Sequence, residues 1–350
     1  MLPLTLIDGS DNIKIVSMTR HARMQDVARL ARVSAITVSR VLRSPEKVSE
    51  DTRERVLEAV RKIGYVPNAI AGSLSSKRSN IIAAIVPTIT NPVFADTIHA
   101  MGGVLREHGY HLLLGQSGAS PAEERSLIET FLARRPDGLF IHGGLHSPEV
   151  RALLLKAGIP IVETGNLRKQ PLDMVVSYSN YAAAEAMTTH LVERGRKRIA
   201  FISAPRRDND RAQARARGFS AALKRHGIAE DARLVLETTL GLRQGAEALL
   251  ELVKREPRLD AAFFAGDVLA AGAIFECQRR GWNVPERVAI AGFDDQEIAS
   301  HIRPALTTVA VPRAEIGRRA AAMLLARLNE APVQPKVVDI GFEIRIRNST

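Results

Sequence analysis

Residues 34–40 combine polar and small apolar side chains at a spacing that suits DNA recognition. Ser34 is placed to N-cap a short helix, with its hydroxyl accepting a hydrogen bond from the amide of Thr37. A short helix that opens on a serine and follows another across a tight turn fits the major groove of DNA. The side chains expected on its outer face are Ala35, Ile36, Thr37 and Arg40.

The other polar motifs do not form a catalytic or metal-binding pattern. Asp294 and Asp295 are adjacent, but no third carboxylate or histidine follows at the spacing of metal ligands, and the 9 histidines form no cluster. The sequence has no Gly-x-x-x-x-Gly-Lys-Ser/Thr loop, no strand-linked Gly-x-Gly-x-x-Gly and no Gly-x-Ser-x-Gly elbow. We therefore expect no catalytic residue, no metal and no cofactor.

The charge of the chain is concentrated near its N-terminus. The 350 residues have a net charge of +11, and residues 18–80 contain 13 Lys and Arg against 6 Asp and Glu. A basic module of this kind indicates contacts with a polyanion such as the phosphate backbone of DNA.

Helical patterns on both sides of residues 34–42 supply the elements that must hold this helix. A first helix is predicted over 25–31, followed by a turn at Arg32-Val33; a third begins at Ser49 and ends at Gly64. Three such helices make a compact headpiece over 24–67. The expected inward positions are Val27, Leu30 and Ala31 in the first helix, Val38 and Val41 in the second, and Val56, Leu57, Val60 and Ile63 in the third.

Residues 68–80 have the composition of a linker. Only 68–75 could form helical turns, and a segment this short is not helical alone, because stable isolated helices need about 12–15 residues. It would need a partner to order it.

From residue 81 onwards, short apolar runs alternate with helical patterns, which predicts parallel sheets covered on both faces. There are too many runs for one open sheet, so two α/β lobes with a cleft between them are expected over 81–346. Ligands of such sheets bind at the carboxyl ends of the strands. The runs are 81–87, 111–114, 138–141, 159–162, 174–177, 199–203, 261–264 and 288–291, with a last one at 337–346.

Several features predict a cytoplasmic protein. The single cysteine, Cys277, rules out an intramolecular disulfide, and its apolar neighbours predict a core position. No apolar run reaches the ~18–20 residues that cross a bilayer, and the first 20 residues do not resemble a signal peptide. Residues 1–23 are expected to be a disordered extension, and Met18 or Met24 could be the true start.

Taken in order, these residues resemble the lactose-repressor (LacI/GalR) family of transcription regulators over 24–345. The headpiece motifs are at 26–28, 33–34, 37–42, 48–53 and 64–68, and the later motifs are at 91–95, 215–219, 265–267, 292–295 and 306–309. Within the family, the chain is most similar to the gluconate-operon repressors. That similarity is found at 87–95, 186–189, 275–279 and 288–293.

The resemblance implies that the headpiece binds an operator half-site. Ala35, Ile36 and Arg40 would face base edges, where an arginine can pair with guanine O6 and N7 for about 1–3 kcal/mol of discrimination. Arg32 departs from the family, which usually has glycine in this turn; an arginine in a left-handed conformation costs about 1 kcal/mol. The implied phosphate contacts are Ser34, Thr37, Ser39, Ser49 and Asn68.

The resemblance also assigns residues 68–75 as a hinge helix that forms when two copies meet on the operator. Ala71 would be a further DNA contact, and Leu74 would insert into a base step of the minor groove and kink the duplex. The alternative is that Leu74 packs within a linker.

In the family, the cleft binds a small effector. The resemblance implies that Arg215 contacts an anionic or hydroxyl group, Asp294 accepts from ligand hydroxyls and Phe94 forms an apolar wall, with Asp267 as a further candidate. The alternative for Arg215 is a surface arginine. Where the family often has Asp-Asn, this chain has Ser179-Asn180; the missing carboxylate suits an acidic ligand such as a sugar acid.

The function we expect is that of a homodimeric repressor of sugar-acid (gluconate-type) utilisation genes, released from its operator DNA by an effector in the cleft. The same fold with another sugar or metabolite as effector, and co-repression instead of induction, remain open. A transport receptor would need a signal peptide and no headpiece, and a sugar-acid enzyme would need an acid/base pair that we cannot identify.

Overall fold

The protein is represented by a computed structural model that describes residues 22–66, 78–118 and 120–350. The chain divides into two units, Met1–Ser79 and Asn80–Thr350. The predicted hinge helix at 68–75, with Asn68, Ala71 and Leu74, lies outside the described residues, as do residues 1–21 of the expected extension.

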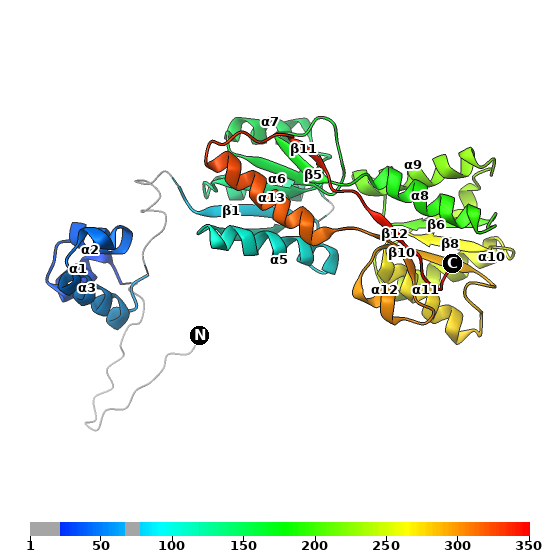
Figure 1. The fold of residues 1–350 in the computed structure, drawn as a ribbon, viewed down its shortest axis with the longest axis horizontal. Helices are drawn as coiled ribbons and strands as arrows, with labels where there is room; N and C mark the ends of the chain where they lie inside the picture. Colours follow the sequence, from blue (N-terminus) through cyan, green and yellow to red (C-terminus); the bar gives the residue numbers. More distant parts are fainter. Residues whose placement is uncertain (1–21, 67–77, 119) are drawn as a thin grey trace, which may run out of the picture. The chain divides into compact units, whose positions relative to one another are not determined.

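The three predicted helices are present in the described part of the first unit, with a short 3-10 turn between the second and the third that was not predicted (Figure 1). They enclose a small core in which Val27, Val38 and Val56 are fully buried. The elements are α1 (Met24–Ala31), α2 (Ala35–Arg43), η1 (Pro45–Lys47) and α3 (Glu50–Ile63).

Two of the predicted core positions in this unit are wrong. Leu30 is 43% exposed and Leu57 is 39% exposed, whereas Ala28 and Ala59 are buried. Each leucine is next in sequence to a buried residue and therefore lies about 100° round the helix from it. The face of each helix that packs into the core is narrower than the apolar pattern in the sequence. Alanines, and not these leucines, occupy the buried positions where the helices meet.

The turn between α1 and α2 has the conformation that the sequence predicts. Arg32 has φ 54° and ψ 46°, in the left-handed region, and the amide of Val33 donates to the carbonyl of Ala28 at 3.0 Å. The hydroxyl of Ser34 then accepts from the amide of Thr37 at 3.1 Å and caps α2. Gly64, with φ 61°, ends α3 in the same left-handed way.

The second unit contains two six-stranded sheets, which define two lobes (Figure 1). Lobe 1 has the all-parallel order β11-β5-β4-β3-β1-β2; lobe 2 has the order β12-β10-β9-β8-β6-β7, parallel except for the β10–β12 pair. The strands of lobe 1 are β1 (Ile81–Val86), β2 (His111–Gln116), β3 (Gly138–His142), β4 (Ile161–Thr164), β5 (Met174–Ser177) and β11 (Val337–Asp339). Those of lobe 2 are β6 (Ile199–Ser203), β7 (Val235–Glu237), β8 (Ala261–Phe264), β9 (Ala289–Asp294), β10 (Thr307–Ala310) and β12 (Glu343–Arg345).

Helices cover the sheets as expected for parallel strands joined by crossovers. In lobe 1 these are α5 (Pro92–Glu107), α6 (Pro121–Leu132), α7 (Pro148–Ala157) and α13 (Arg313–Leu328), with α5 packed on α13. In lobe 2 they are α8 (Asn180–Glu193), α9 (Asp210–Arg225), η2 (Ala232–Leu234), α10 (Leu242–Arg255), α11 (Asp267–Arg279) and α12 (Glu297–His301). Cys277 is buried in α11, as predicted.

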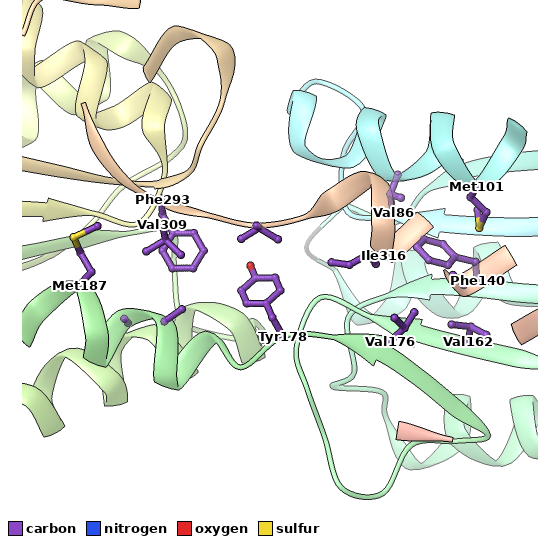
Figure 2. Close-up of a cluster of buried hydrophobic side chains, with 14 of the residues drawn as sticks. Val86, Met101, Phe140, Val162, Val176, Tyr178, Met187, Phe293, Val309 and Ile316 are labelled. Atoms are coloured by element: carbon purple, nitrogen blue, oxygen red, sulfur yellow. The ribbon is translucent and has the colours of Figure 1, made fainter. Parts of the chain in front are cut away.

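The chain crosses between the lobes three times, after β5, β10 and β11. Apolar side chains at these crossings join the cores of the two lobes. Figure 2 shows Tyr178, just after β5, between Phe293 and Val309 of lobe 2 and Val176 of lobe 1. The interlobe connection is therefore packed near the crossovers.

All eight predicted strands between 81 and 291 are present, within a few residues of the predicted bounds. The last apolar run, 337–346, is divided into β11 and β12, which belong to different sheets. No helix in the described part of the chain combines the length and apolar character needed to span a bilayer.

Candidate functional site

The outer face of α2 carries the side chains that the sequence analysis places there. Ile36 is 72% exposed and Arg40 is exposed, while Thr37 and Ser39 are half-buried. Ala35 is the partial exception, because it also packs against the headpiece core. Ser49 is the N-cap residue of α3, but its hydroxyl accepts no bond from a backbone amide there; it donates to Thr52 Oγ1 at 3.0 Å.

A cavity of about 250 Å³ lies between the two lobes. It is at the edge where the parallel strands of both sheets end, the position at which such sheets bind ligands. Its volume is just below the usual ~300–1,000 Å³ of ligand pockets, which suits one small metabolite. Residues from the ends of four strands line it: His142, Thr164, Ser203 and Asp294.

Arg215, from α9, forms part of the cavity wall and is held by three hydrogen bonds. Its Nε donates to Asn180 Oδ1 at 2.8 Å, one terminal nitrogen donates to the carbonyl of Ala265 at 2.8 Å, and the other donates to the Tyr178 hydroxyl at 3.1 Å. The guanidinium carbon lies 3.5 Å from the centre of the Phe293 ring. These contacts fix the guanidinium, which has five N–H groups, and leave two of them without a bond in the described structure.

Two further arginines line the same cavity. Arg211 lies one helical turn before Arg215 on α9, and its terminal nitrogen contacts Asp210 Oδ1 at 3.3 Å. Burial lowers the pKa of Arg211, an effect that Asp210 opposes. Arg313 begins α13, where its Nε donates to Asp96 at 2.9 Å and another nitrogen donates to the carbonyl of Asp294.

Asp294 is the one carboxylate among the residues that line this cavity. It is the last residue of β9, with φ 106°, and its Oδ1 lies 4.0 Å from a terminal nitrogen of Arg215. Burial raises the pKa of this carboxyl group, although Arg215 and Arg313 act in the opposite direction.

Phe94 and His142 are among the residues on the lobe 1 side of the cavity. Their rings meet edge to face, with centres 4.6 Å apart. Burial, together with the charges of Arg211 and Arg215, holds the pKa of His142 well below 6.5. The imidazole is therefore neutral at pH 7.

Asp267 has a different environment from the other predicted effector residues. It does not line the cavity; it accepts hydrogen bonds from the Thr308 hydroxyl at 2.6 Å and from the amide of Gln296 at 2.7 Å. Burial, helped by the charge of Asp294, raises its pKa to about 8. Asp267 thus joins the start of α11 to β10 and to the chain just after β9, and, contrary to the prediction, its carboxyl group is not part of the cavity lining.

The structure brings together Phe94, Arg215 and Asp294 as predicted, and it adds polar lining residues that were not predicted. Arg211 was detectable, because residues four apart lie on the same face of a helix. His142 also had a signal, since it follows a predicted strand directly. No feature of the sequence pointed to Arg313, because its place in the cavity depends on the second crossover between the lobes.

An ionic chain runs from the cavity across the lobe junction. Asp210 contacts Arg211 and also accepts from Arg168 of lobe 1 at 3.3 Å. Arg168 lies 3.3 Å from the buried carboxylate of Glu163. The ring of His146 lies between two carboxylates, 3.6 Å from Glu163 and 3.0 Å from Glu124 of α6.

Two family models match the chain. The model "Bacterial regulatory proteins, lacI family" matches residues 23–68, which contain the headpiece helices. The model "Periplasmic binding protein-like domain" matches residues 188–350, which include most of lobe 2.

Similar proteins cover nearly the whole chain. The HTH-type transcriptional regulator GntR of Escherichia coli K12 is 36% identical over 321 residues, which is 92% of this chain and 96% of that protein. GntR of Pseudomonas aeruginosa is also 36% identical, over 97% of this chain and 98% of that one. The crystal structure of a LacI-family transcriptional regulator from Silicibacter pomeroyi has a TM-score of 0.88 at 32% identity, covering 94% of this chain and 99% of that chain.

Proposed function

The chain belongs to the lacI family of bacterial transcription regulators, and from this premise we propose that it represses sugar-acid utilisation genes until a gluconate-type effector binds between its lobes. Its relatives are transcription regulators and not enzymes. The headpiece is the DNA-binding part, and the interlobe cavity is the effector site.

The exposed face of α2 is proposed to contact bases in the major groove. Arg40 pairs with a guanine, and Ile36 and Ala35 pack against thymine methyl groups. Because Ala35 is half-buried, only the exposed part of its side chain can pack against a thymine methyl group. The phosphate contacts proposed from the family resemblance are Ser34, Thr37, Ser39, Ser49 and Asn68, with Ala71 and Leu74 in the minor groove.

The observation that supports an acidic effector is the charge of the cavity. Three arginines, Arg211, Arg215 and Arg313, line it against one carboxylate, Asp294. Arginines held in place by other contacts bind a carboxylate well, because charge-assisted hydrogen bonds are about twice as strong as neutral ones. The carboxylates that contact Arg211 and Arg313, Asp210 and Asp96, do not line this cavity, so the lining presents a net positive charge that a neutral sugar would not use.

The helices around the cavity add to this preference. Residues from the first turns of α5 and α9 line it, namely Val93, Phe94, Arg211 and Ala212. The amides at the N-terminus of a helix favour anions. Asp294 is proposed to accept hydrogen bonds from the effector's hydroxyl groups, and Phe94 to cover its carbon chain.

Binding is proposed to release the operator by a population shift. The effector stabilises a closed arrangement of the lobes, in which the paired hinge segments of a homodimer no longer order on DNA. The size of the shift depends on how much more tightly one state binds the effector. As a regulator of chromosomal genes, the protein is proposed to act in the cytoplasm at the nucleoid.

A screen of small molecules tests this function. The purified full chain is heated with gluconate, ketogluconates and related aldonates, and with neutral polyols such as glucitol as matched controls. We expect aldonates to raise the Tm and polyols of equal length to have little effect. A hit is then added to a gel shift with duplexes selected from a random pool; stabilisation by neutral sugars alone would contradict the sugar-acid proposal.

A further inference from the structure

His142 is the last residue of β3, and its ring is at the boundary of two cavities. One is the proposed effector cavity, and the other, of about 210 Å³, adjoins it. Within the described part of the chain, neither ring nitrogen of His142 makes a hydrogen bond to another residue. A neutral imidazole has both a donor and an acceptor, so both are available to a molecule in the cavity.

The packing around His142 keeps the ring in this position. The edge of its ring meets Phe94, and β4 pairs beside it through Thr164. A Cβ atom at Gly165 would come within 2.8 Å of His142 Nε2, so only a glycine leaves room for the ring there. Gly165 also has φ +97°, a conformation that other residues rarely adopt. The site is therefore built around the imidazole.

Burial and the charges near His142 explain why its imidazole is neutral. Burial of the ring and the positive charges of Arg211 and Arg215 all lower its pKa. An anion bound to these arginines would offset their charge and add an attractive one, which favours the imidazolium form. Other titratable groups line the two cavities that His142 borders: Tyr178, Asp294 and Arg313 in the first, and Glu124, Arg207, Asp208 and Asp210 in the second.

We propose that His142 contacts the anionic group of the effector directly and takes up a proton from solvent when that group binds between it and Arg211. This inference rests on the proposed function, because it assigns the recognition of the acid group within the same cavity. Arg215 and Asp294, whose nearest side-chain nitrogen and oxygen are 4.0 Å apart, then bind the part of the effector that carries hydroxyl groups. His142 thereby helps to distinguish an acid from a neutral polyol.

The proton uptake has a defined pH dependence. The ring binds the proton more tightly in the complex than in the free protein, so effector affinity rises as the pH falls from the pKa of the complex to that of the free protein. With one proton involved, the affinity changes by at most about tenfold per pH unit. Above and below this range His142 contributes no pH dependence.

Calorimetry of the full chain with gluconate tests the proposal. Titrations at one pH in buffers of different ionisation enthalpy give the number of protons taken up. We expect net uptake by the wild type, no uptake and weaker binding by His142→Gln, and unchanged uptake by His226→Gln, which alters an exposed histidine at the far end of α9. Equal uptake by His142→Gln, or no uptake by the wild type that binds gluconate, would overturn the inference while leaving the proposed function intact.

A second measurement does not depend on gluconate. If gluconate and the other aldonates fail to bind, the proposed function fails, and acetate then tests His142 alone as a simple carboxylate. The ring resonance of His142 is identified by NMR through its loss in His142→Gln. Sodium acetate should move it towards its protonated position at constant pH, whereas sodium chloride of equal ionic strength should not; an unmoved resonance rejects the contact.

Discussion

Arg40 and Ile36 are the most accessible of the proposed base contacts on α2, and the two differ in what they can specify. The guanidinium of Arg40 can form two hydrogen bonds to guanine, whereas Ile36 offers only packing against a methyl group. Arg40→Ala should therefore lower discrimination at one base pair by about 1–3 kcal/mol. Selection of duplexes from a random pool, followed by titrations with single-base variants, measures this change.

Arg29→Ala is the control for Arg40→Ala, because Arg29 is an exposed arginine on α1, away from the proposed base contacts. It should change binding to all duplexes by a similar factor, as the loss of a general charge does. If both variants keep the wild-type preference at every base pair, Arg40 does not contact a base.

The second prediction concerns Arg215, and it uses separate measurements of effector binding and of stability. Arg215→Ala should remove the effector-induced Tm shift and the effector's influence on the gel shift. It should also lower the free energy of unfolding by about 1–3 kcal/mol, because Asn180 Oδ1 loses its donor in a buried position. Arg217→Ala, an exposed neighbour on α9, should do neither. A normal effector response in Arg215→Ala would remove this residue from the site.

The third prediction at this scale is a pH dependence. Burial alone would lower the pKa of His146. The contacts with Glu124 and Glu163 raise it by more than burial lowers it, so the pKa in the folded protein is about 9. The folded pKa lies above the unfolded value of 6.5, so the imidazolium stabilises the protein fully below pH 6.5 and this contribution is lost as the pH rises through 9. The difference is about 3 kcal/mol.

Urea unfolding of the wild type and of His146→Gln, measured at several pH values, isolates this contribution. The stability difference between them should shrink between pH 6.5 and pH 9, while His226→Gln should track the wild type throughout. A constant difference would mean that His146 is not charged in the folded protein.

Among elements, the α1–α2 turn was the most completely predicted. The serine N-cap and the left-handed Arg32 both follow from local sequence, because each depends on residues within one helical turn. Most strands of both lobes were also predictable, since they are short apolar runs that are buried along nearly their whole length; the edge strand β2 is partly exposed but keeps an apolar run. Strands β7 and β10 were not predicted, and β11 and β12 were predicted only as one run, because the pairing of these strands is set by the sheet beside them and not by their own pattern.

The same reasoning limits what sequence could say about the site. Phe94, Arg215 and Asp294 were found through a family resemblance, and they do lie together. The grouping of Arg211, His142 and Arg313 depends on which strand ends are neighbours and on where the chain recrosses. Asp267 matched the motif, but its carboxyl group points to hydrogen bonds within the fold.

Arg32 allows a prediction at the scale of this turn. Replacing it with glycine removes the strain of a left-handed arginine, so Arg32→Gly should stabilise the headpiece by up to about 1 kcal/mol. Hydrogen exchange of the α1 and α2 amides in the full chain measures this locally. Gly64→Ala, at a comparable left-handed position, should shift exchange in the opposite direction; faster exchange in Arg32→Gly would show that its side chain stabilises the turn.

At the scale of the whole molecule, the cavity and the lobe junction share one set of charges. Asp210 of lobe 2 contacts both Arg211, which lines the cavity, and Arg168 of lobe 1. An anion that binds Arg211 can therefore alter the contact that joins the lobes, without any long path between the two events. Coupling of this kind is reciprocal, so a change at the junction must alter effector affinity in turn.

The last prediction concerns a substitution that removes the ionic contact between the lobes. Arg168→Gln leaves Asp210 without its partner in lobe 1 and leaves the buried Glu163 without a cation on that side, which disfavours the arrangement in which the lobes are joined. If the effector stabilises that arrangement, its affinity should fall by about tenfold, a coupling of about 1.4 kcal/mol. Operator affinity without effector should change little. Lys169→Gln, the same change of charge at the next, exposed residue, should leave calorimetric titrations unchanged, and equal effector affinity in both variants would show that the ionic chain is not part of the switch.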